Sequence, residues 1–133
     1  MSTVFSRYHQ PTGLECFDLA VQIEVEIYKV IRKFPKSVRF THAIPLYELA
    51  QRMNDYVVYA NSIYPTSEHE VEVRKDMAQR AIGCNEAIIQ RLKRCAYELE
   101  SVDINSFDKV GEMLIKESTL LRAWKNSTKV QRS

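Results

Sequence analysis

The sequence predicts an all-α protein, an antiparallel up-down-up-down four-helix bundle. The chain of 133 residues contains only 3 Gly and 4 Pro, whereas β-sandwiches, barrels and glycine-loop nucleotide folds need more turns. Apolar residues also recur with the period of amphipathic helices over long stretches. With 45% hydrophobic and 27% charged residues, the composition is that of one globular domain with its own core.

The chain divides into three expected parts: an N-terminal arm over residues 1–13, the bundle over 14–125 and a polar, basic tail over 126–133. The first helix is predicted over residues 14–33 and ends before Pro35, because the residue before a proline avoids the α region. Its polar residues, three or four apart, form one narrow stripe. The rest of its surface is apolar and wider than one neighbouring helix needs: Phe17, Leu19, Ala20, Val21, Ile23, Val25, Ile27, Tyr28, Val30 and Ile31.

A second helix is predicted from Ser37 or Thr41 to about Tyr64. If Thr41 is the N-cap, Pro45 lies near the first turn, where its missing amide hydrogen is tolerated. If Ser37 is the N-cap, Pro45 should kink the helix. The residues expected to point inward follow helical spacing: Phe40, Ile44, Tyr47, Ala50, Met53, Val57 and Tyr64.

The third helix is predicted from Ser67 to about Ser101 and is the longest. Ser67 and Glu70 have the spacing of a capping box, in which the hydroxyl and the carboxylate satisfy free amides at the helix start. Core residues recur every seven positions, as in the seam of a bundle. They form two rows, Val71, Ala78, Asn85, Leu92 and Leu99, and then Ala81, Ile88, Cys95 and Val102.

A fourth helix is predicted to begin after Asp103 or Asn105 and to end at about Trp124 or Lys125. Short loops join the consecutive long helices, so neighbouring helices are expected to run antiparallel. The apolar face of the fourth helix is expected to contain Phe107, Val110, Met113, Leu114, Leu120, Leu121 and Trp124.

Two polar residues occupy positions where apolar ones are expected. Glu24 shares a stripe with Phe17 and Tyr28, and Asn85 interrupts the seam of the third helix. As core residues, Asn85 would fix the helix register and Glu24 would pair with a neighbouring Arg or Tyr, such as Arg52. Alternatively, both belong to an interface between subunits, and the sequence leaves this choice open.

The formal net charge of +2 is too small to indicate a nucleic-acid partner by itself, so the positions of the charges decide. Cations at helix C-termini favour the helix dipole, which explains part of their distribution. The first basic group, five cations with no acid among them, exceeds that need. In an antiparallel bundle the second group lies toward the same end, where the two groups together could hold phosphates without reading bases. The candidate nucleic-acid or polymerase contacts are Lys29, Arg32, Lys33, Lys36 and Arg39 in the first group, Arg91, Lys93 and Arg94 in the second, and Arg122 and Lys125 in the third.

The sequence gives no signal for catalysis, so we expect a protein that is not an enzyme and holds no metal or cofactor. None of its 3 His follows the Glu-x-x-His pattern of di-iron bundles, and it has no phosphate-cradling glycine loop. The odd number of cysteines, without zinc-like spacing, indicates reduced thiols in the cytoplasm; Cys84 and Cys95 are expected in the core. No apolar run reaches the length of a membrane span, and the N-terminus has no secretory pattern.

Two segments resemble a known family. The residues Lys33-Phe-Pro-Lys-Ser-Val-Arg-Phe40 resemble the Lys-Phe-Pro-Lys-Ser-x-Arg-Phe signature of the accessory variability determinant (Avd)-like four-helix-bundle proteins. Residues 113–127 are similar to the end of the Avd branch, although Arg122-Ala123 stands where that branch often has Gly-Gly. The resemblance covers roughly residues 14–127. The family also includes proteins encoded by intervening sequences of bacterial 23S ribosomal RNA.

The resemblance implies a function. Avd proteins serve diversity-generating retroelements: they are not enzymes, they form homopentameric barrels, they bind the element's reverse transcriptase and they contact its template RNA. By this resemblance Lys33, Lys36 and Arg39 are the leading candidates for contact with RNA, cDNA or the polymerase in mutagenic retrohoming. The alternative is a stand-alone interaction protein of the ribosomal intervening-sequence type. In either case the wide apolar face of the first helix suits a homo-oligomer.

Overall fold

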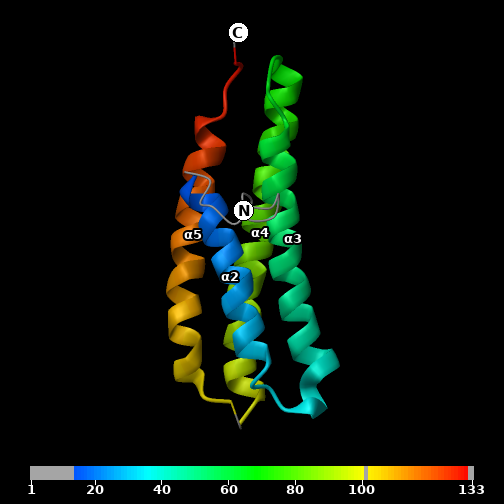
Figure 1. The fold of residues 1–133 in the computed structure, drawn as a ribbon, viewed down its shortest axis with the longest axis vertical. Helices are drawn as coiled ribbons and strands as arrows, with labels where there is room; N and C mark the ends of the chain where they lie inside the picture. Colours follow the sequence, from blue (N-terminus) through cyan, green and yellow to red (C-terminus); the bar gives the residue numbers. More distant parts are fainter. Residues whose placement is uncertain (1–13, 101, 132–133) are drawn as a thin grey trace, which may run out of the picture.

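The computed structural model describes residues 14–100 and 102–131. In these ranges the chain is helical with no strand, which confirms the all-α prediction and is compatible with a helical bundle (Figure 1). The expected N-terminal arm over residues 1–13 lies outside the described residues. The long helices are α2 (Glu15–Ile31), α3 (Ile44–Ser62), α4 (Glu68–Glu98) and α5 (Asp108–Ser127).

The connection between α2 and α3 and the connection between α4 and α5 lie at the same end of the molecule (Figure 1). There, the ring of Phe34, which follows α2, lies 6.2 Å between centroids from the ring of Phe107, which precedes α5. His42, just before α3, hydrogen-bonds to Glu98, the last residue of α4. We call this part of the molecule, residues 32–43 with residues 91–98, the basic end.

The segment between α2 and α3 differs from the expected helix start. The α2 helix ends at Ile31, after which a 3₁₀ turn (Lys36–Val38) and a π-helical turn (Arg39–Ala43) lead into α3. Neither Ser37 nor Thr41 is the N-cap of α3, because that position is Ala43, whose side chain cannot cap. Pro45 lies in the first turn of α3, which is the position that the alternative with Thr41 as N-cap gave it. The N–H of Ile44 bonds to the carbonyl of Arg39, five residues back, and so closes a π turn.

The core is formed by the faces that the apolar periodicity predicts. Both seven-residue rows of α4 are buried, except that Val102 lies beyond the helix and is half-buried. On α3, Ala50, Met53 and Val57 are buried as expected. The predictions for the two ends of the second helix are wrong, because Phe40 is 79% exposed and Tyr64 is 60% exposed. Both residues lie outside the regular turns of α3, where helical spacing no longer fixes the direction of a side chain.

The start of α4 carries the cap that its sequence predicts, with one difference. Ser67 is the N-cap, and its Oγ accepts a hydrogen bond from the N–H of Glu70 at 3.2 Å. The carboxylate of Glu70 accepts from the N–H of Thr66 at 3.0 Å, one residue earlier than in the standard capping box. The hydroxyl of Thr66 also donates to this carboxylate, at 2.5 Å, and the two hydrogen bonds from Thr66 lower the pKa of Glu70. The α4 helix then continues to Glu98, three residues short of the predicted Ser101.

The α5 helix begins at Asp108, later than either predicted start, because a 3₁₀ turn (Ile104–Phe107) capped by Asp103 precedes it. It ends at Ser127, just beyond the predicted Lys125. Beyond the helix, the N–H of Gln131 donates a 2.7 Å hydrogen bond to the carbonyl of Pro65, in the connection between α3 and α4. The described part of the predicted tail therefore contacts the bundle.

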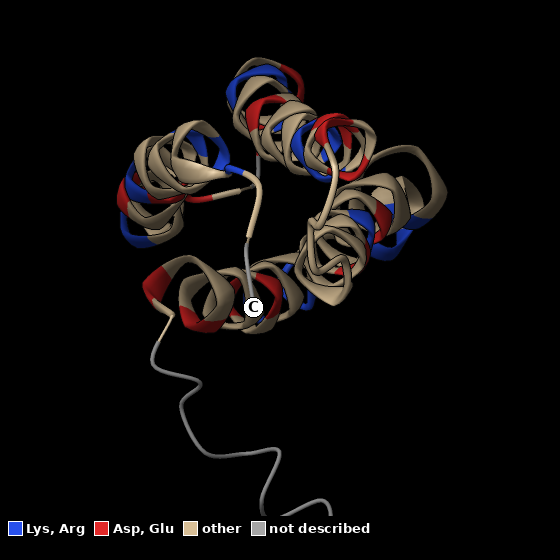
Figure 2. Ribbon diagram, turned by 90° about the horizontal axis from the view of Figure 1, so that it is seen from above, with Lys and Arg blue, Asp and Glu red and all other residues tan. Residues whose placement is uncertain are grey.

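The surface of α2 keeps apolar side chains that its neighbours do not cover. Val21, Val25 and Tyr28 follow helical spacing and are 58%, 48% and 48% exposed. This confirms that the apolar face of the first helix is wider than the packing within one chain requires. Viewed along the bundle, segments with Lys or Arg and segments with Asp or Glu are distributed around it (Figure 2). Because charges of both signs occur around the bundle, a binding surface is better located by charges that lack a partner than by the net charge of a face.

Candidate nucleic-acid interface

The first basic group surrounds the turn at the end of α2. The α2 helix ends at Ile31, and Pro35, in the turn that follows, has ψ of 147° and precedes the 3₁₀ turn Lys36–Val38. Lys33, Lys36 and Arg39 are exposed, and their side chains form no hydrogen bond or ion pair with any residue in the described ranges. The sequence has no acidic residue between Glu26 and Glu48. These cations therefore remain available to an external anion.

Lys29, unlike Lys33, Lys36 and Arg39, has a partner within the protein. Its Nζ lies 3.3 Å from Oε1 of Glu26, and Lys109 of α5 contacts the same oxygen at 3.2 Å. Burial opposes ionisation of Glu26, but the hydrogen bonds from Lys109 and Lys29 outweigh it and lower the pKa of the carboxyl. The expectation that all five cations of the first group are unopposed is thus wrong for Lys29, because side chains three or four residues apart on a helix can meet.

Arg32, Lys36 and Arg39 line one hollow of about 330 Å³ between the end of α2 and the start of α3. The guanidinium carbon of Arg32 lies 5.6 Å from the centroid of the Tyr28 ring, a cation–π contact. Apolar side chains, including Phe34 and Ile44, also line the hollow. The structure thus brings three of the five predicted residues together around one cavity.

The second basic group is divided. Arg91 and Arg94 line a hollow of about 280 Å³ with Thr41, His42 and Glu98, directly beside the segment that carries Arg39. Neither arginine has a hydrogen bond or ion pair to another side chain within the described ranges. Lys93 points elsewhere, because it lines a separate groove between α4 and α5. Helix geometry explains the division, since residues two apart on a helix point in different directions.

Cys95 lies at the hollow of Arg91 and Arg94 but is only 1% exposed. Burial raises the pKa of its thiol and the carboxylate of Glu98 adds to the effect, while Arg91 and Arg94 oppose it. The raised pKa keeps the sulfur protonated and a poor nucleophile. Cys16 and Cys84 are also buried and free, so Cys84 and Cys95 are core residues as the sequence predicts.

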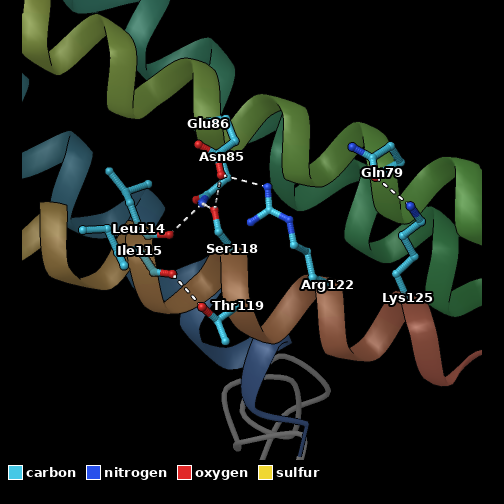
Figure 3. A network of polar contacts seen from close by, with 9 residues as sticks. All are labelled: Gln79, Asn85, Glu86, Leu114, Ile115, Ser118, Thr119, Arg122 and Lys125. Atoms are coloured by element: carbon cyan, nitrogen blue, oxygen red, sulfur yellow. Dashed lines mark hydrogen bonds and ion pairs between the residues drawn. The ribbon is translucent and has the colours of Figure 1, made fainter.

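The third basic group lies at a distance from the basic end and is engaged within the protein. Arg122 forms an ion pair with Glu86 of α4, with Nη2 and Oε1 3.2 Å apart. Lys125 donates a 2.8 Å hydrogen bond to Oε1 of Gln79, also on α4 (Figure 3). These cations contribute to the α4–α5 contact and do not join the other two groups.

Asn85 is fully buried and belongs to the same contact (Figure 3). Its Nδ2 donates 2.7 Å hydrogen bonds to the carbonyl of Leu114 and to Oγ of Ser118. Ser118 in turn donates to Glu86 at 2.9 Å. The structure therefore assigns Asn85 to the core of the protomer, where such a network fixes how α4 and α5 align.

Glu24, the other unexpected polar residue, is half-buried and has a different partner from the one suggested. Its carboxylate accepts a 3.2 Å hydrogen bond from Nδ2 of Asn54, and the proposed pairing with Arg52 is wrong. Asn54 also donates to the backbone carbonyl of Ala20 at 3.0 Å. Burial raises the pKa of Glu24, although the bond from Asn54 opposes the shift.

Sequence reasoning missed the most unusual residue of the core. Glu117 of α5 is 0% exposed, and neither carboxylate oxygen has a hydrogen-bond partner within the described residues. Burial, with the charge of Glu15, raises its pKa to about 8. Burial raises the pKa of the Cys16 thiol to about 11, and Glu117 adds to that shift. The apolar spacing from Val110 through Leu114 to Leu121 includes position 117 and could have revealed it.

The described residues contain no cluster of His, Cys, Asp and Glu that could hold a metal ion. Among the same residues, no helix is long and apolar enough to cross a bilayer. Comparisons of the chain with protein-family models, with curated proteins and with solved structures give no match. The interpretation of the basic end therefore rests on its own geometry.

Proposed function

We propose that this chain is a non-enzymatic, oligomeric accessory protein of a diversity-generating retroelement, similar to the Avd proteins. Its bundle would run up-down-up-down and act in the cytoplasm. There it would hold a reverse transcriptase and its template RNA together during mutagenic cDNA synthesis. This role needs a rigid scaffold, a cationic contact surface and a way to associate with other copies, and it needs no catalytic residue.

The observation that carries the proposal is the set of unpaired cations at the basic end. Lys33, Lys36 and Arg39 stand in the signature that resembles the Avd-like family, and none of them is neutralised by a described residue. Arg91 and Arg94 lie beside the same segment. Phosphate contacts by Lys and Arg supply affinity for nucleic acid without sequence selectivity. This is the kind of contact that a scaffold for a variable template requires.

The second support is the uncovered apolar stripe of α2. Val21 and Val25 border a groove of about 500 Å³ between α2 and α5, which Met113 also lines. Charged residues stand at this groove, among them Glu112 and Lys116. An apolar strip with a charged rim is typical of interfaces between subunits. We propose that copies of the chain associate through this strip, as a pentamer if the resemblance to Avd proteins extends to assembly.

The first test is genomic: a reverse-transcriptase gene with a template repeat should lie beside the gene for this chain. The second is co-purification from cells that express the full-length chain with that polymerase and its template RNA. The wild type should retain both, and the variant with Lys33→Glu, Lys36→Glu and Arg39→Glu should lose the RNA, the polymerase or both at unchanged helicity. The control is the variant Arg122→Glu with Lys125→Glu, which reverses charges in the third basic group, on α5. Retention of neither partner by the wild type, or a gene located within a ribosomal RNA gene, would contradict the proposal and favour the stand-alone bundle.

Oligomerisation has a separate test. Light scattering of the wild type should give the mass of a closed oligomer, and Val21→Glu with Val25→Glu should reduce it to the mass of the monomer. The control is Val58→Glu, since Val58 of α3 is equally exposed, at 61%, but lies on another helix. A wild type that is monomeric at all concentrations would contradict the proposed association of copies through the apolar strip of α2.

A further inference from the structure

The hollow at the end of α2 has a composition that phosphate contacts alone do not explain. Its volume of about 330 Å³ lies at the lower end of the range for small-ligand pockets, about 300–1,000 Å³. Tyr28, Ile31, Phe34 and Ile44 give it apolar and aromatic walls, and Arg32, Lys36 and Arg39 supply the charge. A site for phosphate alone needs donors and cations but no apolar wall.

Two aromatic side chains are accessible here: Tyr28, which lines the hollow, and Phe40, which lies outside the lining but follows Arg39 in the chain. Tyr28 is 48% exposed, and its ring centroid lies 5.7 Å from that of Tyr47, with the rings tilted by 54°. Phe40 is adjacent to Arg39 in the π-helical turn and is 79% exposed. A phenylalanine so exposed contributes little to the stability of the bundle, because its ring remains in water.

The backbone accounts for the position of Phe40. The 3₁₀ turn Lys36–Val38 and the π turn Arg39–Ala43 replace the regular first turn of a helix. A π turn adds a residue to the helical repeat and rotates the side chains that precede it relative to those that follow. In this turn Ala43 is buried in the core while Phe40, which follows Arg39 in the chain, is exposed.

Aromatic rings, apolar walls and unpaired cations together match the chemistry of unpaired nucleotides. Single-stranded RNA offers flat bases that stack on aromatic side chains, with a phosphate between successive bases. Double-stranded RNA keeps its bases stacked on one another and offers only phosphates, sugars and groove edges. The hollow would thus add affinity for a single strand and none for a duplex.

We propose that the basic end binds single-stranded RNA, with one unpaired base in the hollow against Tyr28 and a neighbouring base stacked on Phe40. Lys36 and Arg39 contact the phosphates beside these bases. This inference rests on the proposed function, since it specifies which form of the template RNA the surface recognises. It adds a preference for unpaired nucleotides that charge alone does not provide.

The experiment measures binding of the full-length protein to three fluorescently labelled probes of equal length by anisotropy. The probes are a single-stranded RNA of mixed sequence, the duplex of the same RNA, and a single strand whose central bases are removed. The wild type should bind the first probe most tightly. Phe40→Ala should weaken binding to the first probe by about fivefold or more and leave the other two unchanged, and Phe40→Trp should restore it.

The matched control is Tyr64→Ala, since Tyr64 is 60% exposed but lies beyond the last turn of α3 and away from the basic end. It should leave binding to all three probes unchanged. Equal losses on the single strand and the duplex, or no effect of Phe40→Ala, would overturn the stacking site while leaving the proposed function intact. Failure of the wild type to bind any of the three probes at low salt would instead contradict the proposed function.

Discussion

The basic end and the α4–α5 contact use the same kinds of residues for different purposes. At the α4–α5 contact, Arg122 and Lys125 are held by Glu86 and Gln79 of the opposing helix. At the basic end, Lys36 and Arg39 have no partner among the described residues. The comparison teaches that the count of cations in a sequence does not locate a binding surface. What matters is whether the fold places a carboxylate or an amide oxygen within reach.

This difference predicts which observable each region controls. Changes at the α4–α5 contact and in the core beside it should alter the stability of the bundle and leave RNA binding unchanged. Changes at the basic end should alter RNA binding and leave stability unchanged, because exposed cations without partners contribute little to folding.

The largest effect on stability is expected from Glu117 and depends on pH. Its pKa is near the ordinary carboxyl value when unfolded and about 8 when folded, so between these values the folded state binds the extra proton. The free energy of unfolding should therefore fall as the pH rises from about 4.5 to about 8, by about 1.4 kcal/mol per pH unit at most. Urea denaturation across this range measures the fall.

Glu117→Gln should remove most of this pH dependence and stabilise the protein at pH 8, because a neutral amide replaces a carboxylate that is costly to ionise. Glu112→Gln, at an exposed position of α5, is the control and should keep the wild-type profile. Identical pH profiles for the wild type and Glu117→Gln would show that Glu117 is not buried in solution.

The next effect is expected at Asn85. Asn85→Ala removes both 2.7 Å hydrogen bonds to α5 and leaves the Leu114 carbonyl and the Ser118 hydroxyl without their donor. The free energy of unfolding should fall by about 2 kcal/mol, measured by chemical denaturation. Asn61→Ala, at an exposed position of α3, serves as the reference and should lower the free energy of unfolding much less. RNA affinity should not change in either variant, and a change specific to Asn85→Ala would break the separation between the two regions.

A matched pair of arginines sharpens the comparison directly. Arg39→Ala should weaken RNA binding severalfold with no change in thermal stability, since its guanidinium has no described partner. Arg122→Ala should leave RNA binding unchanged and lower stability by less than about 1 kcal/mol, because its ion pair with Glu86 is largely exposed. The opposite assignment of effects would mean that the wrong basic group has been taken for the binding surface.

The smallest effect is expected from Glu98, the acid that hydrogen-bonds to His42 beside Arg91 and Arg94. Glu98→Gln keeps the shape of the side chain and removes one negative charge from a cationic hollow. RNA should bind about twofold more tightly at low salt, and the gain should disappear as screening increases. Glu100→Gln is the control for a general change in net charge, and an equal gain in both variants would argue against a specific role for the hollow.

Much of the fold could be predicted from the sequence because apolar periodicity reports directly on burial. The seven-residue rows of α4 and the cap at Ser67 were predictable in this way. The direction of Phe40 was not, since it depends on a π turn that no spacing rule anticipates. Glu117 was missed because a carboxylate is normally assigned to the surface, although its position lies on the buried stripe.

The candidate site was predictable only in part. The sequence located Lys33, Lys36 and Arg39 in an acid-free segment, and the structure places Arg91 and Arg94 beside that segment. It did not show that Lys29 is paired with Glu26, nor that Arg122 is paired with Glu86. Such pairings depend on side-chain direction and on contacts between helices, which net charge and local composition do not encode.

The salt dependence of RNA binding tests the central claim that cations left unpaired by the fold make the phosphate contacts. For the wild type, the logarithm of the association constant should fall linearly with the logarithm of salt concentration, with a slope of about −0.7 for each phosphate contact on a single strand. Lys36→Gln with Arg39→Gln should flatten the slope by the equivalent of about two contacts, whereas Arg122→Gln with Lys125→Gln should not change it. Equal slopes for the wild type and the basic-end variant would contradict the account.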